Sequence, residues 1–219
     1  MTDIRAGALL LDMDGTLVDS HAVVERLWTE WSHAHGVDPA RTLAIVHGRQ
    51  GQDSMALLLP DRPHALNLAE NRAMLQQETE QLEGVVALPG AAALLAALEG
   101  LPHALVTSAT RPLAMARMGV AGVPMPPLAV TAEDVSASKP HPEGFLRAAA
   151  LLGVEPAACV VMEDSENGIA AGLAAGMRVI GVGPQAGAAT WVVGAPAAVR
   201  VAAGDGSGIR ITLDAVSRA

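Results

Sequence analysis

The stretch Ala8–Ser20, which reads A-L-L-L-D-M-D-G-T-L-V-D-S, decides the fold class of this chain. The apolar run at its start is typical of a strand buried on both faces of a parallel sheet. The Asp-x-Asp-Gly that follows predicts a turn at the carboxyl end of that strand. Open α/β sheets bind their ligands at this edge, so Asp12 and Asp14 are expected beside a binding site.

Asp12 and Asp14 would point to opposite faces of an extended chain. A strand that ends at Asp12 leaves Asp14 in a loop, from which it can turn toward Asp12. Two converging carboxylates repel each other unless a cation or a proton lies between them. The pair therefore indicates a metal site with a carboxylate free to act as nucleophile or base. The alternative is a plain Asp-Gly turn; an EF-hand calcium loop fits poorly, because its glycine position holds Leu17.

The composition excludes several classes of protein. Of the 219 residues, 51% are hydrophobic and 17% charged, which favours a folded chain with a sizeable core. A net charge of −9, without a cluster of lysine or arginine, disfavours nucleic acid and anionic membranes as partners. The single cysteine, Cys159, rules out an intrachain disulfide and agrees with a cytoplasmic location. We expect no signal peptide and no transmembrane helix.

The order of apolar patterns predicts an α/β fold with an inserted helical part. Val23, Leu27 and Trp31 recur at helical spacing, and no segment of residues 20–84 reads as a buried strand. From residue 91 onward, expected helices at 91–98, 112–118, 142–152 and 168–175 alternate with expected strands at 104–106, 129–131, 160–162 and 179–182. This is the pattern of a doubly wound parallel sheet. A turn at 204–208 and a last strand at 209–213 complete the prediction.

Three later strand ends also deliver polar groups. Thr107 and Ser108 offer hydroxyls and backbone N–H groups that suit a phosphate oxygen, although a helix cap is the alternative. Lys139 lies in S-A-S-K-P-H-P, where it can neutralise an anion or stay solvated in a loop. Glu163 and Asp164 end another apolar run, as hard oxygen ligands for Mg²⁺ or as capping acids.

Together these motifs resemble the haloacid dehalogenase-like phosphatase superfamily. The matching segments are D-M-D-G-T-L-V-D-S, V-T-S, S-K-P-H-P and M-E-D-S-E-N-G-I-A-A-G-L-A-A-G, and the resemblance covers nearly the whole chain. It implies a Rossmann-like core formed by residues 1–17 and 88–219. It also implies a small α-helical cap formed by residues 18–87, with Asp19 as a hinge residue that anchors the cap.

The resemblance assigns roles to individual residues. Asp12 would be the nucleophile that forms an aspartyl-phosphate, and Asp14 the general acid and then the base. Ser108 and Lys139 would hold the phosphoryl oxygens. Mg²⁺ would bind Asp12, the Asp14 carbonyl and Asp164, with Glu163 nearby. The residues expected to contact phosphate or substrate are Gly15, Thr16, Thr107, Ala109, His47, Gly48 and Arg49.

The implied function is a phosphoric monoester hydrolase that acts on a small sugar or polyol phosphate, such as a hexitol, glycerol or 2-deoxyhexose phosphate. We expect a monomer with no nucleic-acid or membrane partner. The strongest alternative is an isomerase of the β-phosphoglucomutase type. Such mutases carry a histidine at the place that Val24 occupies here, and His21 lies one helical turn earlier, which favours the hydrolase.

Two other functions receive less support from the sequence. G-V-G-P-Q-A at residues 181–186 matches a dinucleotide-binding fingerprint, as an oxidoreductase would carry. The match is weak because it lies late in the chain and Pro184 has no N–H to offer a phosphate. A non-catalytic module that binds a phosphorylated metabolite is disfavoured because the acids of every motif are intact.

Overall fold

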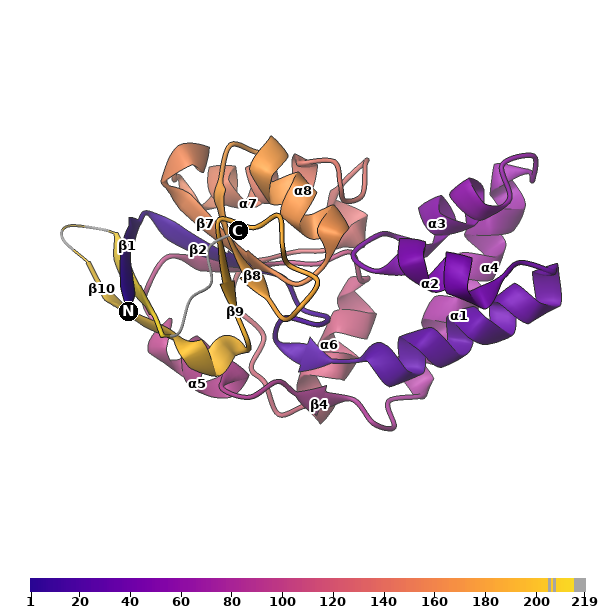
Figure 1. The fold of residues 1–219 in the computed structure, drawn as a ribbon, viewed down its shortest axis with the longest axis horizontal. Coiled ribbons are helices and arrows are strands. Elements are labelled where there is room, and N and C mark those ends of the chain that lie inside the picture. Colours follow the sequence, from indigo (N-terminus) through magenta and orange to yellow (C-terminus); the bar gives the residue numbers. More distant parts are fainter. Residues whose placement is uncertain (205, 207, 215–219) are drawn as a thin grey trace.

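The centre of the molecule is a six-stranded parallel sheet (Figure 1). The computed structural model describes residues 1–204, 206 and 208–214. In order across the sheet the strands are β6 (Ala129–Val130), β5 (His103–Val106), β2 (Ala8–Leu11), β7 (Cys159–Glu163), β8 (Arg178–Val182) and β9 (Trp191–Val193). The opening apolar run thus forms a central strand, and the predicted α/β fold class is confirmed.

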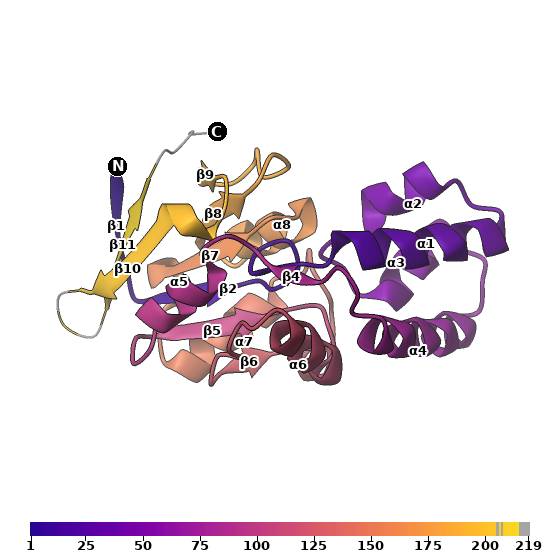
Figure 2. The same ribbon diagram turned by 90° about the horizontal axis from the view of Figure 1, so that it is seen from below.

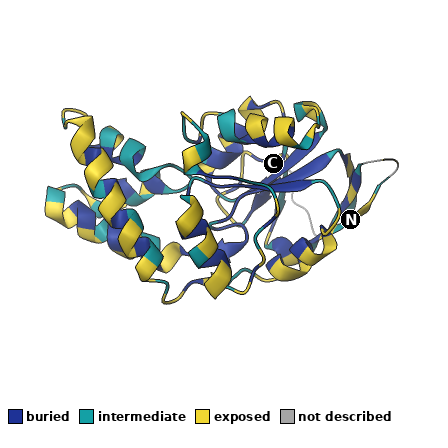
Figure 3. Ribbon diagram, turned by 180° about the vertical axis from the view of Figure 1, so that it is seen from behind, coloured by how far each residue is buried: buried dark blue, intermediate teal, exposed yellow. Residues whose placement is uncertain are grey.

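Helices cover both faces of this sheet. They are α5 (Ala91–Ala97) and α6 (Arg111–Val120) on one face, and α7 (Glu143–Leu152) and α8 (Glu166–Ala174) on the other. Leu9 and Leu11 pack in the cluster with α5 and α6, whereas Ala8 and Leu10 pack in the cluster with α7 and α8. Successive side chains of a strand point to opposite faces, so burial on both faces requires an unbroken apolar run. Figure 3 shows the strands as the buried layer between the helices.

The register of the sheet brings several predicted site residues to one level. Leu11 of β2 lies opposite Leu105 of β5 and Met162 of β7. The N–H of Asp12 then donates to the carbonyl of Met162 at 3.0 Å. Because parallel strands share their direction, the next residues along these strands meet at one edge of the sheet. This edge carries Asp12 and Glu163.

The N-terminus forms a strand of a second, antiparallel sheet, which the sequence pattern did not predict. This sheet consists of β1 (Thr2–Ala6), β11 (Ile209–Leu213) and β10 (Val199–Ala203), in that order. In β1 only Ile4 and Ala6 are buried, so two apolar side chains among polar ones gave a weak signal. The expected last strand exists as β11, but it pairs here and not in the parallel sheet. Residues 205 and 207 of the expected turn lie outside the described residues.

The inserted segment is helical, as predicted. It holds α1 (His21–His35), α2 (Pro39–Val46), α3 (Gly51–Leu58) and α4 (His64–Glu80). These helices pack around an apolar cluster of their own, formed by Trp28, Trp31, Val46, Met55, Leu58 and Met74. Figure 2 shows them at the end of the molecule opposite β1, β10 and β11. No helix in the described part of the chain is both long and apolar enough to cross a membrane.

The helical part joins the sheet through a two-stranded antiparallel connection. Its strands are β3 (Val18–Asp19) and β4 (Val86–Ala87), and the boundaries expected for the cap, residues 18 and 87, fall in this pair. Oδ1 of Asp19 accepts the backbone N–H of His21 at 3.2 Å and contacts Nδ1 of the same histidine at 2.9 Å. Asp19 therefore stabilises the first residue of α1, at the point where the chain enters the helical part.

The glycine-rich segment after β8 is a turn, and the chain continues into β9 without an α-helix between them. A Cβ on Gly181 would lie 2.3 Å from the Cβ of Ala186, so this glycine allows close packing of the turn. A dinucleotide-binding fingerprint requires a helix that starts at the glycine turn. Close packing thus accounts for Gly181, and the left-handed backbone of Gly183, with a φ of +80°, accounts for the second glycine of this motif.

Candidate active site

A buried lysine joins residues from three of the predicted motifs. Nζ of Lys139, which precedes α7, donates to Oδ1 of Asp12 at 2.5 Å and to Oε1 of Glu163 at 2.7 Å. It also donates to the carbonyl of Val106 at 3.1 Å. Burial disfavours the charged ammonium, but the carboxylates of Asp12 and Glu163 outweigh it and raise the pKa of Lys139. Lys139 therefore carries a positive charge beneath Asp12.

Three carboxylates converge around this lysine. Asp12, Glu163 and Asp164 each offer an oxygen, and these oxygens lie within 4.8 Å of one another. Burial, reinforced by repulsion from Glu163, raises the pKa of Asp12 well above its usual value and that of Asp164 to about 8. One lysine cannot neutralise three acids. A group of hard oxygen donors with excess negative charge is the chemistry that Mg²⁺ requires, so the residues present fit this cation.

The partners of Glu163 separate it from the other two acids. Glu163 is fully buried, and its Oε2 accepts the N–H of Ser165 at 2.8 Å and the hydroxyl of Ser165 at 3.0 Å. Its Oε1 accepts from Lys139. Both oxygens of Glu163 are thus engaged within the protein. Glu163 therefore positions the ammonium group of Lys139. Asp12 and Asp164 are the acids that are better placed to bind a cation.

Gly15 and Thr16 shape the position of Asp164. The hydroxyl of Thr16 donates to Oδ1 of Asp164 at 3.1 Å. Gly15 has a φ of +78°, and a Cβ built there would lie 2.1 Å from Oδ2 of Asp164. The turn after β2 therefore needs glycine for two reasons, its left-handed backbone and the close approach of this carboxylate.

Replacing Gly15 with alanine will lower activity by about 100-fold or more, because the added methyl displaces Asp164 and small displacements at a reacting centre are costly. Steady-state turnover checks this result. Gly84→Ala is the matched control: Gly84 also has a positive φ, +83°, but open space around it. Both variants should lose about 1–2 kcal/mol of stability from the left-handed backbone. Equal activity of the two variants would contradict the role given to the Gly15–Asp164 approach.

The carboxylate of Asp14 lies apart from the acidic cluster. The sequence allows Asp14 to turn toward Asp12, but in the structure its Oδ1 accepts hydrogen bonds from the hydroxyl of Ser20 at 2.7 Å and from Nη1 of Arg117 at 2.9 Å. Arg117 belongs to α6 and is buried, and its Nη2 donates to Oε2 of Glu78 in α4 at 3.0 Å. The ion pair with this buried guanidinium holds the Asp14 carboxylate outside the group formed by Asp12, Glu163 and Asp164.

Sequence reasoning missed Arg117 and Glu78. The available signal was a charged residue at an apolar position: Arg117 lies four residues after Leu113, on the buried face of α6. Charged side chains are almost never fully buried without a partner. An arginine on that face therefore implied an acid elsewhere in the chain, but not which one.

One of the two hydroxyls after β5 contacts the helical part of the protein. Ser108 donates from Oγ to the carbonyl of Gly48 at 2.9 Å. The N–H of Ala109 donates to Oγ1 of Thr107 at 3.0 Å, which closes the turn. In this structure the hydroxyl of Ser108 thus links the strand end to the segment between α2 and α3.

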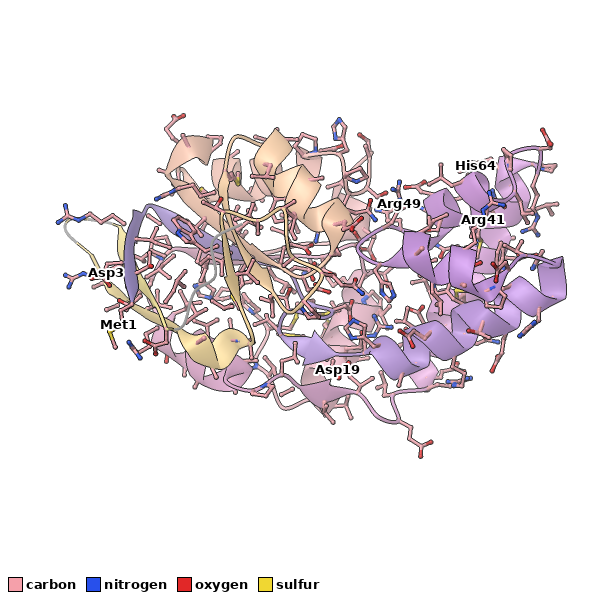
Figure 4. The ribbon with its side chains drawn as sticks, in the orientation of Figure 1. Met1, Asp3, Asp19, Arg41, Arg49 and His64 are labelled. Atoms are coloured by element: carbon pink, nitrogen blue, oxygen red, sulfur yellow. The ribbon has the colours of Figure 1, made fainter. Side chains whose placement is uncertain are left out.

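That segment, residues 47–49, also contacts the start of α8. Nη2 of Arg49 donates to Oδ1 of Asn167 at 2.9 Å, and Nδ2 of Asn167 donates to the carbonyl of His47 at 2.8 Å. Figure 4 shows Arg49 at the junction between the helical part and the sheet. The ring centroids of His47 and His21 are 5.5 Å apart. Burial, followed by the charge of His21, lowers the pKa of His47.

A cavity of about 90 Å³ lies between the sheet edge and the helical part. It brings together most of the predicted site residues, namely Asp12, Asp14, Gly15, His47, Gly48, Arg49, Thr107, Ser108, Ala109 and Asp164. The side chains of Trp28, Asn71, Glu78 and Arg117 line the same cavity and were not predicted as site residues. Thr16, Lys139 and Glu163 do not line it; they support the residues that do.

The doubly wound sheet carries buried carboxylates and a paired lysine at its strand ends, and the inserted helices lie over them. This arrangement is typical of α/β enzymes with an acidic active centre. Comparison with known families makes this class specific. The chain belongs to the haloacid dehalogenase-like hydrolase family, whose model matches residues 6–176.

Individual relatives agree with that assignment. Hexitol phosphatase A of Escherichia coli (strain K12) is 45% identical over 181 residues, which are 82% of this chain and 84% of that protein. Glycerol-1-phosphate phosphohydrolase 2 of Saccharomyces cerevisiae is 32% identical over 190 residues, 82% of this chain and 75% of that protein. These names agree with the predicted enzyme class, a phosphoric monoester hydrolase.

One solved structure shares the fold of this chain over most of its length. The β-phosphoglucomutase of Clostridium difficile superposes with a TM-score of 0.77 at 22% identity, and the match covers 88% of this chain and 92% of that one. At this identity the likeness shows the fold alone. It therefore does not decide between hydrolase and mutase.

Proposed function

We propose that this protein is a Mg²⁺-dependent phosphatase that hydrolyses a small sugar or polyol phosphate through an aspartyl-phosphate on Asp12. The observation that carries the proposal is the position of Asp12. Its carboxylate lines the cavity between the two parts of the protein and is held from behind by the charged Lys139. A carboxylate that is held in this position can act as a nucleophile on the phosphorus of a phosphate ester bound in the cavity.

In the first step an oxygen of Asp12 forms a bond to phosphorus while the bond from phosphorus to the leaving oxygen breaks. Asp14, which lines the same cavity, gives its proton to that leaving oxygen. In the second step Asp14 takes a proton from water, the water oxygen bonds to phosphorus, and the bond to Asp12 breaks. Ser20 and Arg117 keep the Asp14 side chain in one orientation for both transfers.

Asp12 and Asp164, with the main-chain carbonyl of Asp14, are the groups we assign to Mg²⁺. When bound, the cation supplies positive charge that offsets the phosphoryl oxygens. Thr16 and Gly15 fix Asp164, and Glu163 fixes Lys139, so the surrounding shell orients each acid. Ser108 and Lys139 are the groups we assign to the phosphoryl oxygens, because phosphoryl transfer depends mainly on positioning and charge neutralisation.

The helical part, residues 18–87, is proposed as a cap that closes the site. Its side chains would contact the leaving group and thereby select the substrate. The contacts of Gly48 with Ser108 and of Arg49 with Asn167 hold it against the sheet edge. A cavity of about 90 Å³ favours a small leaving group, since the pockets that bind drug-sized ligands measure roughly 300–1,000 Å³. Polyols and monosaccharides are small leaving groups of this kind, and closure of the cap would exclude water from the first step.

Phosphate release from a set of monoesters tests the proposal. With Mg²⁺ present, the protein is expected to release inorganic phosphate from a hexitol phosphate, glycerol phosphate or a deoxyhexose phosphate, and a chelator should abolish the release. Conversion of a sugar 1-phosphate to its 6-phosphate without free phosphate would instead establish the mutase. Val24, where mutases carry histidine, lines the cavity, which supports the hydrolase. Absence of release from every ester would refute it.

A further inference from the structure

Arg117 and Glu78 form a buried ion pair that the proposed chemistry does not use directly. Arg117 comes from α6 beside the sheet, and Glu78 comes from α4 in the helical part. Their exposed fractions are 2% and 7%, and both line the cavity that holds Asp12. A buried ion pair is costly to desolvate and is weak evidence for a purely stabilising role.

The pair has unused hydrogen-bonding capacity. Nε of Arg117 is buried and has no hydrogen-bond partner among the described residues. Glu78 accepts from Arg117 through Oε2, while no hydrogen bond to its Oε1 is found within the described part of the chain. A buried polar atom without a partner costs free energy. Glu78 lines the cavity, so its unused Oε1 is the acceptor of the pair that a hydrogen-bond donor of a ligand could complete.

A carboxylate acceptor next to a guanidinium donor matches one kind of ligand well. A hydroxyl group both donates and accepts, so a hydroxyl of a sugar or polyol can give its hydrogen to Glu78 and receive one from Arg117. Arg117 is shared between two acids, Glu78 and Asp14, so this end of the cavity has no spare positive charge for a second anion and favours a neutral group. An aryl or alkyl ester without hydroxyls would leave the ion pair intact but its unused hydrogen-bonding atoms, such as Oε1 of Glu78, without a partner.

We propose that Glu78 and Arg117 recognise a hydroxyl of the leaving group and thereby select sugar and polyol phosphates. The inference rests on the proposed function and specifies how that site chooses its substrate. Selection by unpaired polar groups is strong, because a site built to hydrogen-bond a hydroxyl rejects the analogue that lacks it.

The position of Arg117 links this selection to the reaction. The same guanidinium contacts Glu78 at 3.0 Å and Asp14 at 2.9 Å, and Asp14 is the proposed proton donor to the leaving oxygen. Since Glu78 belongs to the helical part and Arg117 to the core, the hydroxyl site is complete only when the two parts are in contact. A leaving group that bridges them would hold the site closed.

Glu78→Gln tests the proposal because it keeps the size of the side chain and removes its charge. The measurement is kcat/KM for a hexitol phosphate and for para-nitrophenyl phosphate, whose leaving group carries no aliphatic hydroxyl. The ratio of the two values is expected to fall about 10- to 100-fold, with most of the loss on the hexitol ester. Glu80→Gln, an exposed residue of the same helix, is the control and should keep the wild-type ratio.

A binding measurement gives a second readout. In an Asp12→Asn background that cannot turn over, Glu78→Gln should weaken binding of the hexitol phosphate about tenfold or more, with a smaller change for inorganic phosphate. If Glu78→Gln does not fold, Glu78→Asp is used, because aspartate keeps the charge but has a shorter side chain. The same difference between binding of the hexitol phosphate and binding of inorganic phosphate is then measured.

An equal loss on both esters, which leaves the ratio unchanged, would show that the pair only holds the two parts together. No loss on either ester would show that the pair does not bind a hydroxyl of the leaving group. Either result overturns the inference while phosphatase activity stands. A wild-type protein that hydrolyses para-nitrophenyl phosphate but no sugar or polyol ester removes the proposed substrate class and the inference with it. Hydrolysis of neither ester removes the proposed phosphatase itself.

Discussion

Asp12→Asn will lower the rate of phosphate release by about 10⁴-fold or more, because the amide cannot attack phosphorus. The protein should remain folded. Asparagine can still accept the hydrogen bond that Lys139 gives to Asp12, and the substitution removes one of three mutually repelling carboxylates. We therefore expect a melting temperature equal to or above that of the wild type, measured without metal.

Asp61→Asn is the matched control for this variant, since Asp61 is exposed and lies in the connection between α3 and α4. It should leave both rate and melting temperature unchanged. An Asp12→Asn protein that keeps more than about a tenth of the wild-type rate would exclude Asp12 as the nucleophile. The aspartyl-phosphate would then have to be abandoned, although a hydrolase in which a carboxylate activates water would remain possible.

Lys139→Met will destabilise the protein and inactivate it. The substitution leaves Asp12, Glu163 and Asp164 without their cation, and breaking a buried ion pair from one side costs about 3–5 kcal/mol. Denaturant unfolding without metal measures this loss. Turnover should fall by about 10²–10³-fold as well, the range found when one preorganised donor to a developing charge is removed.

The double variant Lys139→Met/Glu163→Gln separates the two effects. Removing the charge of Glu163 relieves part of the repulsion, so the double variant should recover a measurable part of the lost unfolding free energy. Activity should not return, because the ammonium group that holds Asp12 and that we assign to a phosphoryl oxygen is still missing. Recovery of activity together with stability would mean that Lys139 serves only to balance Glu163.

The sequence by itself was sufficient for the parts of this protein that depend on local patterns. Four apolar residues before Asp12 predict a strand buried on both faces, and they form the central strand β2. Polar residues placed directly after β2, β5 and β7 could be assigned to one sheet edge, because parallel strands end on the same side. The helical insertion followed from helical spacing of apolar residues. The strand β1 was not predicted, because only two of its five residues, Ile4 and Ala6, are buried and the apolar pattern is therefore weak.

The tertiary structure decided how the site residues divide their work, because these contacts join residues far apart in the chain. Asp14 lies 103 residues from Arg117, and Arg117 lies 39 residues from Glu78. The periodicity of a helix or a strand does not connect positions so far apart in the sequence. The packing of α4 against α6 brings Glu78 and Arg117 together. The sequence determined which carboxylates reach the edge of the sheet. Only the folded chain determined that Asp12 pairs with Lys139 while Asp14 pairs with Arg117, since each buried acid takes the cation that the fold places beside it.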